Sequence, residues 1–124
     1  MRYLRLASVI AVMVALTSSV QAHHSFAMFD KNKSVTLKGE VSRVNWTNPH
    51  VYIFIDVPNA NGNAEPVRYA IECNSPNVLV RGGWKPSTVK HGDSISITFY
   101  PLRDGRPGGL LDWVTLSDGT RIKG

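Results

Sequence analysis

The sequence holds a single cysteine, Cys73, among its 124 residues, so an internal disulfide bond is excluded. It also lacks an apolar run of roughly 20 residues, the length that a membrane-spanning helix needs. The 14 Lys and Arg residues are spread among 9 Asp and Glu residues and form no basic cluster, which argues against a surface built to bind nucleic acid. The fold must therefore be stabilised by apolar burial, and Cys73 is expected to be a small apolar residue at a strand end.

Catalytic motifs are missing as well. The Gly-x-Ser-x-Gly sequence that presents a nucleophilic serine does not occur. The glycine-rich segment 105–109 lacks the strand-to-helix context of a phosphate-binding loop. The carboxylates show no spacing typical of an acid–base pair; those considered are Glu40, Asp56, Glu72 and Asp112. We therefore predict that the protein is not an enzyme.

The first residues have the three parts of an export signal. Arg2 and Arg5 are basic, Leu6 to Leu16 is almost entirely apolar, and Ala22 is a small residue at the position a signal peptidase recognises. The alternative, a membrane anchor, requires a longer apolar run. The sequence therefore predicts a signal peptide over residues 1–22 and a mature protein in the periplasm or outside the cell.

Removal of that segment changes the charge and size of the chain. Of 124 residues, 102 remain, and the net charge falls from +5 to +3 because two arginines are lost. A length of about 100 residues favours one domain with one core. We divide the mature chain into an N-terminal arm over residues 23–33, docked and extended, and a domain over residues 34–124.

The first strand of this domain is predicted over Ser34 to Trp46. Apolar and polar residues alternate along it, but the alternation slips by one residue after Arg43. A slip of one residue in a long strand indicates a β-bulge or a sharp bend, and Gly39 in mid-strand points the same way. A long, bent first strand is what a small barrel needs in order to pair with two neighbours.

Four further strands and one helix are predicted. The strands are His50 to Val57, Pro66 to Cys73, Ser94 to Leu102 and Leu110 to Leu116. The helix is predicted between the strands Pro66 to Cys73 and Ser94 to Leu102. Ser75 is a good helix N-cap, Pro76 suits the first helical turn, and Gly82 or Gly83 supplies a left-handed stop.

This order of elements predicts an all-β fold, a small five-stranded Greek-key barrel of the oligonucleotide/oligosaccharide-binding (OB) type with one short helix after its third strand. The alternative is an open β-sandwich.

Short motifs along the mature chain resemble one family of small exported bacterial proteins, known only as a domain of unknown function. They are His23-His24-Ser25-Phe26, Val35-Thr36-Leu37-Lys38-Gly39, Trp46-Thr47-Asn48-Pro49-His50, Ser75-Pro76-Asn77, Arg81-Gly82-Gly83-Trp84, His91-Gly92-Asp93 and Val114-Thr115-Leu116. The resemblance covers essentially the whole mature chain. It implies export and a small β-barrel, and it brings no established activity.

Three histidines are candidate metal ligands. After cleavage, His23 would offer its α-amine and its Nδ1 to the same ion, and with a further imidazole this arrangement suits copper. His24 is adjacent, and His50 follows the Asn48-Pro49 turn. Met28 offers a soft sulfur ligand, although a role in apolar packing is the simpler interpretation of this residue. We therefore predict binding of copper or another divalent metal through His23, His24 and His50; the alternative is that these side chains are simply exposed to solvent.

A metal-free binding module is the second functional hypothesis. The barrel face or the loop Asp104 to Gly109 would then hold an envelope protein or a small ligand, since export removes most nucleic-acid partners. Most aromatic residues are expected in the core and not on a stacking face; they are Trp46, Tyr52, Phe54, Tyr69, Trp84, Tyr100 and Trp113. His91, in a turn, is expected to be a surface residue.

Overall fold

The computed structural model describes residues 24–62 and 64–124. The predicted export signal over residues 1–22 and the predicted ligand His23 lie outside the described residues. Within the described part, no helix has the length and apolar character needed to cross a membrane. In chain order the elements are α2 (His24–Ala27), β1 (Val35–Asn45), β2 (Tyr52–Val57), β3 (Val67–Glu72), α3 (Pro76–Arg81), β4 (Ser94–Pro101), β5 (Gly108–Thr115) and β6 (Arg121–Lys123).

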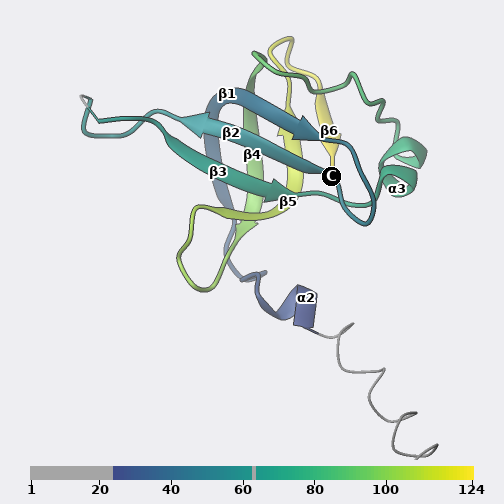
Figure 1. Cartoon of the computed structure of the whole chain (residues 1–124), viewed down its shortest axis with the longest axis horizontal. Coiled ribbons are helices and arrows are strands. Elements are labelled where there is room, and N and C mark those ends of the chain that lie inside the picture. The colour runs from purple at the N-terminus through teal and green to yellow at the C-terminus, as the bar shows by residue number, and fades with distance from the viewer. Residues whose placement is uncertain (1–23, 63) are drawn as a thin grey trace, which may run out of the picture.

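Five of the strands close into a barrel (Figure 1). The order across the sheet is β3-β2-β1-β4-β5-β6, and a further pairing of β3 with β5 joins the two sides. That closing pair is parallel, whereas the other pairs are antiparallel. The predicted five-stranded OB-like barrel is therefore confirmed, and the open sandwich is wrong. β6 folds back on β5 as a short hairpin outside the closed ring.

The predicted bend in the first strand is a β-bulge. The pairing of β1 with β2 shifts register between Val41 and Arg43, which leaves Ser42 as the extra residue. Before the bulge β1 pairs with β4, from Val35 opposite Phe99 to Glu40 opposite Ser94. β1 pairs with β2 from Glu40, opposite Asp56, to Asn45, opposite Tyr52, so the bulge lies just beyond the point where pairing with β4 ends.

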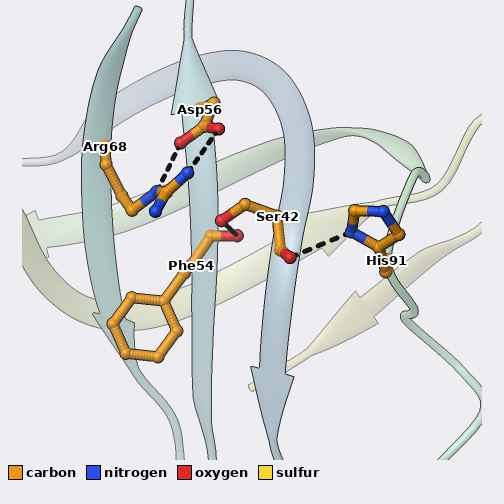
Figure 2. A network of polar contacts seen from close by, with 5 residues as sticks. All are labelled: Ser42, Phe54, Asp56, Arg68 and His91. Atoms are coloured by element: carbon orange, nitrogen blue, oxygen red, sulfur yellow. Dashed lines mark hydrogen bonds and ion pairs between the residues drawn. The ribbon is translucent and has the colours of Figure 1, made fainter.

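Side chains secure the backbone of this bulge (Figure 2). The Ser42 hydroxyl donates to the carbonyl oxygen of Phe54 at 3.2 Å. The Ser42 carbonyl oxygen accepts from Nδ1–H of His91 at 2.9 Å, and the N–H of Gly92 donates to the carbonyl oxygen of Val41 at 2.8 Å. His91 is exposed, as predicted, and it holds the bulge where β4 no longer pairs with β1.

The short helix after β3 closes one end of the barrel. Ser75 caps it, because its hydroxyl accepts the N–H of Val78 at 3.4 Å. Leu79 is the helical residue that enters the core. Trp84, just beyond the helix, is 3% exposed and donates from its indole Nε1 to the carbonyl oxygen of Lys123 at 2.7 Å. The predicted N-cap and helix are confirmed.

The core is apolar and continuous through the barrel. Its buried members are Val41, Val51, Ile53, Ile55, Ile71, Cys73, Leu79, Trp84, Val89, Ile95, Ile97, Phe99, Leu111 and Val114. Cys73 is among them, as predicted, and burial raises the pKa of its thiol.

The expectation that most of the seven aromatic side chains enter the core is wrong. Trp84 is buried there, and Trp46 and Tyr69 pack against it. The other four lie outside the core cluster: Tyr52 and Phe54 of β2, Tyr100 and Trp113. Tyr52 and Phe54 alternate with the fully buried Ile53 and Ile55. Successive side chains of a strand point to opposite faces, so the two rings project outside the barrel. There they stack on each other, with ring centroids 6.3 Å apart.

Candidate functional site

A histidine, a glutamate and a tyrosine meet on the outer face of β2 and β3. Tyr52 lies directly opposite Glu72 in the pairing of these strands. His50 comes two residues before Tyr52, and the chain between them stays extended, since the N–H of Cys73 donates to the carbonyl oxygen of Val51 at 2.8 Å. Because side chains alternate along an extended chain, His50 and Tyr52 project from the same face, one on each side of Glu72.

Glu72 binds both neighbours at once. Its Oε1 lies 2.9 Å from Nδ1 of His50, and its Oε2 accepts the Tyr52 hydroxyl at 2.8 Å. The Glu72 side chain is 14% exposed and that of His50 is 36% exposed. A carboxylate only accepts, so Nδ1 of His50 carries the proton. In the neutral tautomer that this contact favours, the lone pair is on the opposite ring nitrogen, Nε2, of a side chain that is partly exposed.

The cluster also perturbs Tyr52. Burial, followed by the hydrogen bond to Glu72 and the negative charge of that carboxylate, raises the pKa of Tyr52 from 10.0 to about 12. The phenol therefore stays protonated and remains a donor to Glu72 at any physiological pH. Glu72 is consequently held from one side by a permanent hydrogen bond.

We predict that Tyr52 titrates later than an ordinary tyrosine. The unfolded chain loses this proton near pH 10, the folded protein only near pH 12. The protonated Tyr52 phenol therefore contributes fully to the stability of the folded protein below pH 10, and this contribution is lost as the pH rises toward 12. An ultraviolet absorbance titration of wild type minus Tyr52→Phe isolates this phenol. In Glu72→Gln the pKa should fall part of the way, because burial remains. A Tyr52 that titrates with the other tyrosines near pH 10 would contradict the geometry.

The N-terminal arm docks beside this cluster from Met28 onward. Phe29 is 3% exposed and forms an isolated bridge with Leu102. The backbone N–H of Arg103 donates to the carbonyl oxygen of Met28 at 2.8 Å. The side-chain Nε of Arg103 donates to the carbonyl oxygen of Ala27 at 3.0 Å. Residues 27–29 of the arm therefore lie against the segment that follows β4.

The arm differs from expectation in two respects. It begins as the short helix α2 (His24–Ala27), not as an extended segment. Of its apolar residues only Phe29 is buried, whereas Phe26 is 58% and Met28 40% exposed. A buried Phe29 is enough to fix the arm, because backbone hydrogen bonds to the end of β4 supplement it.

A small cavity joins the arm to the cluster. Its volume is about 220 Å³, and Met28, Phe29, Tyr52 and Glu72 are among its lining residues. The arm and Glu72 therefore border the same cavity, and Oε1 of this carboxylate contacts His50.

The predicted ligands are only partly placed. His50 lies in the cluster, the backbone of His24 belongs to α2, and His23 lies outside the described residues. Among the described residues, no three His, Cys, Asp or Glu side chains gather as a metal-binding group. Glu72 was missed, because it is one of several scattered carboxylates in the sequence. Only the register that sets it opposite Tyr52 identifies it, and register depends on the length of the intervening hairpin.

Comparison with known protein families gives a match. A family described as a family of unknown function (DUF6152) matches residues 11–112, a span that includes the arm, the His50–Glu72–Tyr52 cluster and the strands of the barrel through most of β5. No curated protein and no solved structure matches the chain. Because the match covers well over half of the sequence, the chain belongs to this family of unknown function (DUF6152).

Proposed function

We propose that the protein is exported and that its barrel binds copper, or another divalent metal of similar preference, through His50 and the histidines of a mature N-terminus, His23 and His24. The observation that carries this proposal is the 2.9 Å contact between Nδ1 of His50 and Oε1 of Glu72. It is the arrangement that metal-binding histidines commonly have.

The contact prepares Nε2 of His50 for a metal ion. Histidines that bind metals usually donate their other ring N–H to a carboxylate, which fixes the tautomer and makes the ligand more basic. Here Glu72 is that carboxylate, and it is itself oriented by the hydroxyl of Tyr52 at 2.8 Å. His50 is exposed enough, at 36%, for an ion to approach from solvent.

The arm supplies a reason to include the N-terminus. Met28 lines the same cavity as Glu72, and five residues of extended chain span at most about 18 Å. A free α-amine and an imidazole on one residue form a chelate, and both lose their protons readily at neutral pH.

The test is a copper titration of protein that begins at His23, compared with protein that carries one extra N-terminal glycine. We expect the extension to weaken binding strongly, because it removes the α-amine from the chelate. His50→Ala should weaken binding further, and Glu72→Gln should do so by roughly 10- to 100-fold, as is usual for partners of metal-bound histidines.

His91→Ala is the matched control. His91 is also an exposed histidine, but its Nδ1 is bonded to the carbonyl oxygen of Ser42 at the bulge, so its removal should leave the copper affinity unchanged. Equal affinity of the two N-terminal forms would remove the α-amine from the site. Unchanged binding after His50→Ala would remove the cluster.

A second candidate function is a metal-free binding module, as favoured by a cavity of about 330 Å³ beside the loop between β4 and β5. The cavity lies in the size range of small-molecule sites, at its lower end, about 300 to 1,000 Å³. Arg106 and Leu102 line both this cavity and the smaller one beside Glu72. The two functions use different residues for their chemistry, so each can be tested without the other.

A further inference from the structure

The barrel has a cavity at one end, whereas buried side chains fill the other end. Leu79 of α3 and Trp84 close the filled end, and Figure 1 shows α3 and the β4–β5 loop on different sides of the barrel. The hollow end lies where β1, β3 and β5 begin and β4 finishes. Its lining residues are Val35, Val67, Tyr69, Phe99, Pro101, Leu102, Gly105, Arg106, Pro107 and Gly108.

The pairing of the strands explains why this end is open. The first half of β1, from Val35, pairs with β4, and pairing of β1 with β2 begins only at Glu40 opposite Asp56. The first half of β1, from Val35 to Gly39, therefore has β4 beside it but not β2. Val35 and Val67, the first residues of β1 and β3, stand on either side of the resulting space.

Most of the residues that line the cavity have apolar side chains. Phe99, which is 1% exposed, forms part of the lining, and the ring of Tyr69 lies 5.9 Å from it at an angle of 60°. Valine, proline and leucine side chains make up most of the remainder. Such a surface gains free energy when an apolar group replaces water against it.

Arg106 is the charged residue of the cavity lining, and it forms an exposed ion pair with Asp104. Its Nε donates to Oδ2 of Asp104 at 2.7 Å, and its backbone N–H donates to Oδ1 of the same carboxylate at 3.0 Å. These contacts hold the side chain in one direction but use a single guanidinium donor. A guanidinium has five N–H donors, so those on Nη1 and Nη2 remain to form the paired hydrogen bonds that arginine makes with a carboxylate.

We propose that this end of the barrel binds a small molecule with an apolar chain or ring and one carboxylate. The apolar part lies against Phe99, Tyr69 and Val67, and the carboxylate meets Arg106. Small-molecule sites typically combine an apolar wall with a few placed polar groups. The inference rests on the binding-module function and not on the metal site.

The test uses octanoate and 1-octanol, two probes that share an apolar chain and differ in the carboxylate. Binding is followed by NMR on the purified protein in the presence of a chelator, so that a failed copper titration has no bearing on the result. We expect octanoate to bind at least about tenfold more tightly than octanol, as a charged hydrogen-bonded pair implies. The amide signals that shift should be those of the cavity lining.

Two variants and one control separate the contributions. Arg106→Gln should weaken octanoate binding about tenfold and leave octanol binding unchanged. Val67→Trp should fill the cavity and abolish the binding of both. Arg81→Gln removes an equal charge from α3 and should change neither.

Equal affinities for octanoate and octanol in the wild type would overturn the proposal, as would an Arg106→Gln protein that binds octanoate normally. Signal shifts located away from the cavity would overturn it even if Val67→Trp failed to fold.

Discussion

Replacing Trp84 with alanine is expected to lower the free energy of unfolding by about 3–5 kcal/mol, the cost of deleting a large buried aromatic side chain. Trp84 is 3% exposed, and it links two distant parts of the chain. Its backbone N–H donates to the carbonyl oxygen of Leu79 at 3.0 Å, and its indole donates to that of Lys123 at 2.7 Å. The substitution therefore removes both the closure of the barrel end and an attachment for β6.

Trp84→Phe separates these two effects. It keeps most of the apolar volume and removes only the indole N–H, so we expect a smaller loss, about 1–3 kcal/mol, from the unpaired Lys123 carbonyl oxygen. Chemical denaturation gives both values, and hydrogen exchange should show faster opening of β6. Trp113→Phe is the control, because Trp113 lies partly exposed beneath Arg121. If Trp84→Ala were no more costly than Trp113→Ala, Trp84 would not be closing the barrel.

The fold was predictable from the sequence because its signals are local. Ser75 and Pro76 carry the chemistry of a helix start whatever surrounds them. The slip in alternation near Arg43 reports a bulge because one extra residue must change the face of every later side chain. Each of these rules needs only a few neighbouring residues, so a single sequence is enough to apply it.

The site was less predictable because it depends on contacts between distant residues. Glu72 is 22 positions from His50, and only the pairing of β2 with β3 brings them together. Tyr52 and Phe54 have the composition of core residues, and their outward placement follows from strand phase alone. The arm starts as α2, although His24 to Ala27 carries no periodic pattern that would predict a helix.

Gly109→Ala is expected to cost about 3 kcal/mol, at the upper end of what overpacking usually costs. Gly109 lies at the closing seam, where it pairs with Pro101 of β4 and with Ile71 of β3. A Cβ atom here would collide with the carbonyl oxygen of Tyr100 and with the ring of Phe99. The carbonyl oxygen belongs to a strand backbone, so relief requires the seam itself to open.

Gly82→Ala is the matched control. Gly82 has φ of −81°, which alanine adopts without strain, and the nearest atom to an added Cβ would be the Leu79 carbonyl oxygen at 3.3 Å. Its change in stability should stay within about 1 kcal/mol. Thermal and chemical unfolding of the two variants compare the seam with a helix end. A Gly109→Ala protein as stable as the Gly82→Ala protein would mean that β3 and β5 can separate at little cost in free energy. The antiparallel strand pairs would then account for the stability of the barrel.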